Sequence, residues 1–245
     1  MQAMKKLLSI FRERERTINY TCDLCGREVF ENERICASCM AELPANDGNI
    51  CPHCGRRVGE EGVCMDCKDW QLGVERARSA FLYRGGAARL ILSFKSDRRY
   101  LAYTLAELSY PVFAREFSSA EALVFVPMTK KAEGQRGYNQ SRLFAGELSL
   151  RSGIPLLDAV EKVHETLPQK TLSRRERGKN LKSCFRVKDR AAVKNKRLVI
   201  IDDALTTGAT VSELAAVLLR AGAKSVSAFT FASVENSHSA SLKAR

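Results

Sequence analysis

Two adjacent carboxylates, followed closely by a loop of small and hydroxyl-bearing residues, are the part of this sequence best suited to chemistry. Asp202 and Asp203 precede the loop, whose residues are Thr206, Thr207, Gly208, Ala209 and Thr210. Backbone N–H groups and hydroxyls in such a loop bind phosphate, because glycine lets the backbone turn tightly around an anion. Carboxylates repel phosphate and suit ribose hydroxyls or a divalent metal instead. The motif therefore indicates a phosphorylated sugar, and the absence of the Walker pattern disfavours a nucleoside triphosphatase.

The elements on either side of this motif predict where it lies in the fold. Residues 198–201 are apolar and mostly β-branched, which is typical of a strand covered on both faces in a parallel sheet. Ligands bind at the carboxyl ends of such strands, where the acidic pair should lie. Residues 211–218 have an apolar face and predict a helix that ends at Gly222, with its positive end toward the loop. A purely structural alternative exists, because Thr210 and Glu213 also match a helix capping box.

Eight of the nine cysteines occur in pairs with two residues between the partners. The pairs are Cys22 and Cys25, Cys36 and Cys39, Cys51 and Cys54, and Cys64 and Cys67. This spacing lets a tight turn direct two thiolates at one metal, and two turns complete a tetrahedron around zinc. A disulfide framework is the alternative, but it needs an export route, and residues 1–16 show no export signal.

An internal repeat indicates how the cysteine pairs are grouped. Residues 22–29 and 51–58 share the pattern Cys-x-x-Cys-Gly-Arg-x-Val, and a second pair follows each copy at nearly the same distance. Each copy therefore predicts one structural zinc ion, two per chain, with interleaved pairs as the alternative. His53 is expected to be exposed or to support a ligand by hydrogen bonding, and Cys184 to be an ordinary thiol rather than a nucleophile.

Basic residues follow another predicted strand, at 123–126. Lys130, Lys131 and Arg136 lie in an expected loop that could neutralise a pyrophosphate, with a solvated basic loop as the alternative. Residues 167–180 are polar and basic, and predict either a flexible flap over a polyanion or a disordered surface loop. Further strands are expected at 79–84, 185–187 and 226–232, and helices at 87–95, at 98–116 with an interruption at Pro111, and at 138–151.

Composition sets limits on the class of protein. A chain of 245 residues can bury one substantial core and carry a smaller module. Its formal charge is +12, and residues 162–197 contain thirteen Lys or Arg against three acidic residues, an excess suited to phosphates. No stretch approaches the roughly 20 apolar residues that cross a bilayer. We therefore expect a soluble, cytoplasmic protein with no membrane insertion.

Residues 198–210 resemble the phosphoribosyl pyrophosphate (PRPP) motif of type I phosphoribosyltransferases. Other motifs extend the resemblance over nearly the whole chain and occur in the order of the ComF family. They are the cysteine pairs, Phe94-Lys95, Val126-Pro127, the 136–140 run Arg-Gly-Tyr-Asn-Gln, and the 169–180 loop. The chain departs from the family pattern at Tyr138, where Phe is more usual, and at Thr129, where Pro is common.

The resemblance implies an α/β fold, a type I phosphoribosyltransferase-like parallel sheet with an N-terminal double zinc ribbon. The implied domains are an N-terminal extension at 1–20, the double ribbon at 21–70, the phosphoribosyltransferase-like domain at 76–235 and a polar tail at 236–245. It also implies that Asp202 and Asp203 contact the ribose hydroxyls, while the loop at 206–210 holds the 5-phosphate. The expected phosphate and pyrophosphate contacts are Lys95, Lys130, Lys131, Arg136 and Arg177.

The function implied by this family is that of a PRPP-binding phosphoribosyltransferase, a glycosyltransferase with an unknown acceptor, acting in uptake or processing of single-stranded DNA in natural transformation. Mg²⁺ would bind with PRPP, mainly through PRPP oxygens. Expected partners are PRPP, single-stranded DNA and DNA-uptake machinery such as a helicase. Two alternatives stay open: a non-catalytic nucleic-acid-binding adaptor, and a zinc-dependent partner-binding module with a vestigial site.

Overall fold

The computed structural model describes residues 20–30, 33–69, 72–164 and 184–235. The chain divides into two compact units, Met1–Glu42 and Leu43–Arg245. The described part of the smaller unit contains one helix, α2 (Ala37–Ala41), and an antiparallel bridge between Thr21 and Glu28. Its interior is formed by two thiols, Cys22 and Cys39, together with Val29 and Ile35.

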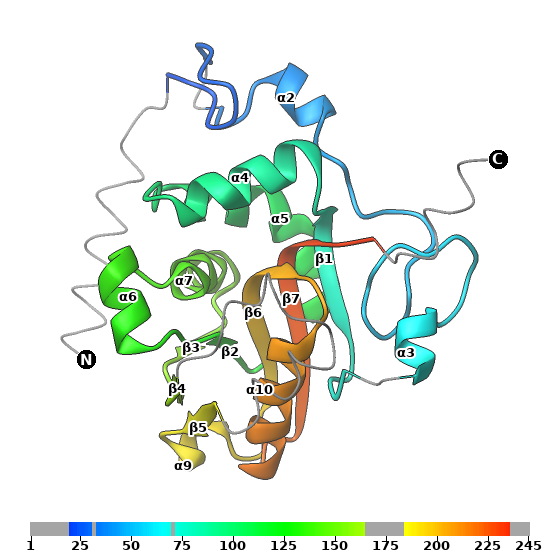
Figure 1. Cartoon of the computed structure of the whole chain (residues 1–245), viewed down its shortest axis with the longest axis vertical. Coiled ribbons are helices and arrows are strands. Elements are labelled where there is room, and N and C mark those ends of the chain that lie inside the picture. The colour runs from blue at the N-terminus through cyan, green and yellow to red at the C-terminus, as the bar shows by residue number, and fades with distance from the viewer. Residues whose placement is uncertain (1–19, 31–32, 70–71, 165–183, 236–245) are drawn as a thin grey trace. The chain divides into compact units, whose positions relative to one another are not determined.

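The larger unit contains a five-stranded sheet in which every strand pair is parallel (Figure 1). The strands, in spatial order, are β1 (Ala77–Leu82), β7 (Ser225–Ser233), β6 (Arg197–Leu205), β2 (Ala122–Phe125) and β3 (Leu156–Leu157). The central strands are almost wholly buried, because helices cover both faces of a parallel sheet. The predicted α/β fold with a parallel sheet is confirmed.

Alternate residues of the strands pack against different helices, which produces three layers (Figure 1). On one face, Ala228 and Ile200 share a cluster with Leu214 and Leu218 of α10 (Ala209–Arg220). On the other face, the Phe229 ring centroid lies 5.3 Å from that of Phe113 and 6.3 Å from that of Phe144. The elements carrying these two rings are α5 (Leu101–Phe117) and α7 (Gln140–Ser152), and α4 (Gly85–Lys95) precedes them. The motif strand β6 is thereby held from both sides.

Shorter elements complete the larger unit. They are the helices α3 (Met65–Asp69), α6 (Lys130–Arg136) and α9 (Arg190–Val193), and the antiparallel strands β4 (Val160–Lys162) and β5 (Phe185–Val187). The segment predicted as a flap, 167–180, lies outside the described residues. No helix in the described ranges combines the length and hydropathy needed to cross a membrane.

Two predicted features of the helical layer are wrong. Helix α5 continues through Pro111 without the expected interruption, because buried side chains on both sides of it, such as Leu105 and Phe113, hold the helix in place. The basic segment expected as a loop forms α6 instead. Its N-cap is Thr129, whose Oγ1 accepts a hydrogen bond from the Ala132 N–H at 3.2 Å, and Gly137, at φ +82°, ends it.

Candidate functional site

The acidic pair lies near the carboxyl end of β6, which runs four residues further than expected and includes both aspartates. Asp203 is only 4% exposed, and the Nζ of Lys95, from the last turn of α4, lies 2.5 Å from its Oδ2. The hydroxyl of Ser141, from α7, donates a hydrogen bond of 2.7 Å to Oδ1 of Asp202. The backbone N–H of Asp203 donates to the same oxygen at 2.9 Å. Side chains from two helices therefore orient the carboxylates.

Burial and the neighbouring charge of Asp203 raise the pKa of Asp202 to about 7, although the Ser141 hydrogen bond and the Lys95 ammonium oppose this shift. Burial alone lowers the pKa of Lys95, but the charge of Asp203 and its hydrogen bond outweigh burial and raise it. The protein thus keeps Lys95 charged while Asp202 changes its protonation close to neutral pH.

Asp202→Asn is expected to stabilise the larger unit more at pH 8 than at pH 5. The folded-state pKa lies above the ordinary value of 3.8, so stability falls as pH rises from about 4 to 7 and the proton leaves. Asparagine mimics the protonated acid and keeps Oδ1 as an acceptor for Ser141. The gain over wild type should be about 1–2 kcal/mol greater at pH 8, measured by urea unfolding at both pH values. An equal gain at both values would contradict a protonated Asp202.

The predicted phosphate loop lines a cavity of about 370 Å³ together with the acidic pair and Lys95. Gly208, at φ +80°, is the N-cap of α10, a left-handed conformation that favours glycine. The Thr207 hydroxyl accepts a hydrogen bond from the Ala209 N–H at 3.4 Å. Helix α10 begins at Ala209, so Thr210 lies inside the helix and the capping-box alternative is wrong. The loop and the helix N-terminus therefore present backbone N–H groups near the carboxylates.

A second cavity, of about 250 Å³, shares Asp202, Asp203 and Thr210 with the first. It extends past Gln140 and Ser141 to Pro127, Met128, Thr129 and Lys162, where a third, larger groove of about 1020 Å³ begins. Basic residues dominate the polar lining of this groove: Lys130, Arg142, Lys162, His164, Arg186, Lys188, Arg190 and Arg220, against Glu133, Asp158 and Glu161. The cavity around the acidic pair is thus continuous with a basic surface.

The structure brings together only part of the predicted set of basic phosphate contacts. Lys95 lies in the first cavity and Lys130 lines the groove. Arg136 donates a hydrogen bond to Oε1 of Gln140 at 2.8 Å, and Lys131 is exposed on α6. Neither is among the described residues that line the three cavities. Arg177 lies outside the described residues.

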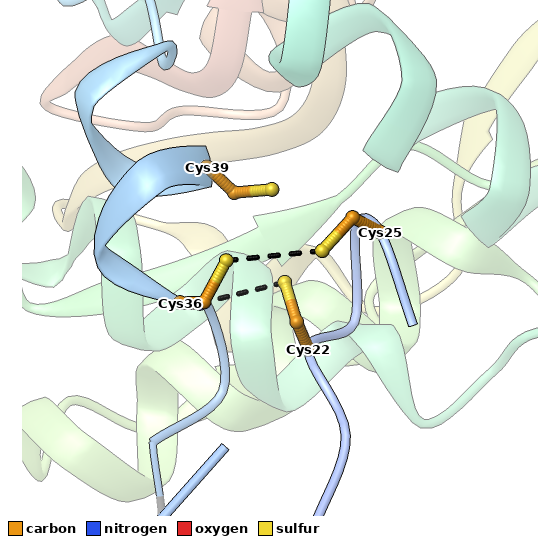
Figure 2. A group of neighbouring side chains, drawn as sticks. All are labelled: Cys22, Cys25, Cys36 and Cys39. Carbon is orange, nitrogen blue, oxygen red and sulfur yellow. Dashed lines mark hydrogen bonds between the residues drawn. The ribbon is translucent and has the colours of Figure 1, made fainter. Parts of the chain in front are cut away.

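The eight paired cysteines form two clusters, Cys22, Cys25, Cys36 and Cys39, and Cys51, Cys54, Cys64 and Cys67. Figure 2 shows the four thiols of the first cluster directed toward one another. The Sγ atoms of Cys25 and Cys36 are 3.7 Å apart, and those of Cys54 and Cys64 are 3.6 Å apart. A zinc–sulfur bond of about 2.3 Å gives a tetrahedral edge of about 3.8 Å. The clusters therefore fit zinc, and the sequential grouping of the pairs is confirmed over the interleaved one.

Backbone donors further prepare each cluster for a metal. The N–H of Cys36 donates to the sulfur of Cys22 at 3.4 Å, and the N–H of Cys64 donates to the sulfur of Cys51 at 3.5 Å. Burial raises the pKa of the Cys22 and Cys51 thiols, but backbone donors outweigh it and lower both to about 7. Such donors favour the thiolate form that binds zinc.

The remaining sequence candidates have structural positions. His53 is exposed, which is one of the two alternatives predicted for it. Its backbone carbonyl accepts a hydrogen bond from the Ala77 N–H at 2.7 Å. Cys184 is 1% exposed, and burial raises the pKa of its thiol, as expected for an unreactive cysteine. Two residues that contact the motif, Ser141 and Arg56, were not predicted from the sequence. Neither lies in a local pattern that would have indicated its distant partner.

Comparisons with known proteins agree with this arrangement. A family model described as a double zinc ribbon domain matches residues 19–68, and one described as a phosphoribosyl transferase domain matches residues 139–243. The chain is similar to the competence protein ComFC of Bacillus subtilis (strain 168), with 32% identity over 234 residues, 86% of this chain and 90% of that protein.

Two further relatives come from other bacteria. The DNA utilization protein YhgH of Salmonella typhi is 32% identical over 219 residues, covering 86% of this chain and 95% of that protein. Competence protein F of Haemophilus influenzae is 28% identical over 221 residues, covering 85% of this chain and 94% of that protein. With these identities spanning most of both chains, the protein belongs to the ComF family and combines a double zinc ribbon with a phosphoribosyltransferase domain.

Proposed function

We propose that this protein binds PRPP, with the 5-phosphate in the loop at 206–210 and the ribose hydroxyls on Asp202 and Asp203. The observation that carries this proposal is the single cavity of about 370 Å³ in which the loop, the helix N-terminus and both carboxylates meet. Backbone donors suit the phosphate, and carboxylate oxygens suit sugar hydroxyls. The match to a phosphoribosyl transferase domain over residues 139–243 supports the same ligand class.

The proposed reaction is phosphoribosyl transfer to an acceptor. Pyrophosphate would leave the anomeric carbon as positive charge develops on the sugar, a step that depends on positioning and electrostatics. Mg²⁺ would accompany PRPP, bound mainly by the ligand's own oxygens. Lys95 is the one Lys or Arg among the described residues that line the first cavity, and we propose that it contacts phosphate in addition to balancing Asp203. Lys130, Lys131, Arg136 and Arg177 are proposed to offset charge on pyrophosphate, with Arg136 first leaving Gln140.

Calorimetry of the wild-type chain with PRPP, with and without Mg²⁺, tests the ligand assignment. Saturable binding with one site per chain, strengthened by Mg²⁺, is expected. Release of pyrophosphate from PRPP should then be screened across nucleobases and amines. The acceptor is unknown, and pyrophosphate leaves whichever acceptor is used. Binding without release across that panel would favour a non-catalytic role, whereas absence of binding would end the proposal.

We further propose that the protein acts in uptake or processing of single-stranded DNA in the cytoplasm, alongside DNA-uptake machinery such as a helicase. The relatives' names, competence protein and DNA utilization protein, support this role. The groove of about 1020 Å³ supplies a basic surface beside the sugar-phosphate site. The non-catalytic adaptor, which would use the same groove for DNA phosphates, is the second candidate on this observation.

Binding of a labelled single-stranded oligonucleotide is expected to weaken steeply as salt rises. Each phosphate neutralised by a basic residue releases counterions, so the logarithm of affinity should fall with the logarithm of salt by about 0.7 per contact. Replacing Arg190 and Arg220 with alanine should flatten this slope, whereas replacing Lys224, which is not among the described residues that line the groove, should change it less. A slope near zero for the wild-type chain would exclude phosphate-driven DNA binding.

A further inference from the structure

The buried guanidinium of Arg56 links the second cysteine cluster to the phosphate loop. Arg56 follows Cys54 by two residues and is 3% exposed. One terminal nitrogen donates to Oδ2 of Asp66 at 2.7 Å, and Asp66 lies between the ligands Cys64 and Cys67 on α3. The other terminal nitrogen donates to the backbone carbonyl of Thr206, the first residue of the phosphate loop. Arg56 therefore connects three segments: its own, which contains Cys51 and Cys54, the segment with Cys64 and Cys67, and the phosphate loop.

We propose that Arg56 is a positioning residue that transmits the geometry of the second zinc cluster to the phosphate loop, so that zinc in this cluster sets the affinity for PRPP. The inference rests on the proposed PRPP site and adds a determinant of its affinity. The second ribbon thereby has a role in PRPP binding. This role is indirect, because four protein thiolates surround its zinc site and PRPP does not bind the metal.

The orientation of one peptide bond explains how Arg56 could act. Arg56 is absent from the described residues that line the cavity, so its guanidinium holds the Thr206 carbonyl from the protein side of the loop. In a planar trans peptide the N–H points opposite to the carbonyl. Fixing the Thr206 carbonyl therefore directs the Thr207 N–H away from Arg56, where an anion in the cavity can accept its hydrogen bond.

The second ribbon is also packed firmly enough to transmit position. Its four cysteines share a hydrophobic cluster with Leu205 of β6 and Val211 of α10, the elements on either side of the loop. Gly55 approaches β1 so closely that an added Cβ would lie 2.4 Å from the Ala77 carbonyl oxygen. A shift of the ribbon would therefore displace Arg56 rather than be absorbed by loose contacts.

The first repeat shows that this arginine contact is not required by the ribbon itself. Arg27 occupies the position of Arg56, and both repeats form the same backbone bond, from Cys22 N–H to Arg27 O at 2.7 Å and from Cys51 N–H to Arg56 O at 2.9 Å. Arg27, however, is exposed, and the position of Asp66 is taken by the exposed Ser38. The pairing of a buried arginine with Asp66 is therefore specific to the ribbon that meets the phosphate loop.

The coupling must act in both directions, because a change in ligand affinity caused by one site is matched at the other. Zinc in the second cluster would strengthen PRPP binding, and PRPP would strengthen retention of that zinc ion by the same factor. Zinc in the first cluster would respond to neither.

The test compares PRPP affinities of the zinc-loaded full-length chain and its variants by calorimetry with excess Mg²⁺. Arg56→Ala should bind PRPP about tenfold more weakly or worse while holding two zinc ions, because a buried charge-assisted hydrogen bond is lost. Arg56→Lys should recover part of the affinity, and Arg27→Ala should match wild type. Asp66→Asn, which removes the charge at a partly exposed partner, should weaken binding severalfold and decides the matter if Arg56→Ala fails to fold or to hold zinc.

A second measurement follows the reciprocal effect. With a zinc-selective chelator in excess Mg²⁺, PRPP should slow the loss of one of the two zinc ions in the wild-type chain, and at the same PRPP concentration it should slow that loss less in the Asp66→Asn variant. If the Arg56→Ala and Asp66→Asn chains hold two zinc ions and bind PRPP with wild-type affinity, Arg56 does not position the loop, and the proposed function is unaffected. Absence of PRPP binding to the wild-type chain would instead overturn the proposed function, and this inference with it.

Discussion

Serine substitution of Cys51 and Cys54 is expected to unfold the larger unit, whereas the same change at Cys22 and Cys25 should leave it folded. Structural zinc contributes on the order of 10–16 kcal/mol in zinc-finger peptides, which equals or exceeds the roughly 5–15 kcal/mol by which whole domains are stable. Loss of the second zinc should therefore remove most of the thermal transition, measured by circular dichroism.

The two clusters differ because only the second is part of the hydrophobic core of the larger unit. All four of its cysteines are buried, and Cys51 and Cys54 are 0% exposed. Without the metal, their four thiols would lie close together in an apolar environment that also includes Leu205 and Val211. The first cluster belongs to the smaller unit and includes the exposed Cys25.

Metal analysis provides the control for this comparison. The wild-type chain should contain two zinc ions, and the variant with serine at residues 22 and 25 should contain one. That variant should retain the melting transition of the larger unit. Equal melting temperatures for the two double variants would show that the second cluster does not support the fold, and one zinc ion in the wild-type chain would contradict two independent sites.

The second large effect is expected from neutralising the acidic pair. Asp202→Asn/Asp203→Asn should weaken PRPP binding about a hundredfold or more, because each carboxylate would lose charge-assisted hydrogen bonds worth about 1.5–3 kcal/mol with ribose hydroxyls. Calorimetry at pH 8 is the appropriate measurement, because the pKa of Asp202 is raised to about 7 and its carboxylate is then ionised.

Electrostatics provides a sharp control for this experiment. Removing two negative charges, and freeing Lys95 from Asp203, should strengthen or preserve binding of inorganic pyrophosphate, which has no ribose. The matched variant Asp158→Asn/Glu161→Gln removes two carboxylates that instead pair with Lys188 and Arg186 on the groove, and should bind PRPP as wild type does. Unchanged PRPP affinity in the Asp202 and Asp203 variant would contradict contact between these residues and the sugar.

The sequence alone determined the features whose chemistry depends on nearby residues. Cysteine spacing and the internal repeat predicted two clusters and their grouping, because a tight turn brings both members of a pair to one metal. The apolar run before Asp202 predicted a buried strand of a parallel sheet, and Gly208 predicted the turn before α10. The prediction of a loop for the basic segment was wrong, because Thr129 caps this segment and makes it a helix.

Only the tertiary structure decided which distant residues complete the site. Ser141 and Asp202 are 61 positions apart, and Arg56 and Thr206 are 150 positions apart. The repeat treats Arg27 and Arg56 as equivalent, yet Arg27 is exposed, whereas Arg56 is buried against the predicted phosphate loop. Short-range patterns specify turns, caps and metal ligands because those interactions lie within a few residues. Contacts between a ribbon and a sheet depend on packing of complete elements, which no local spacing records.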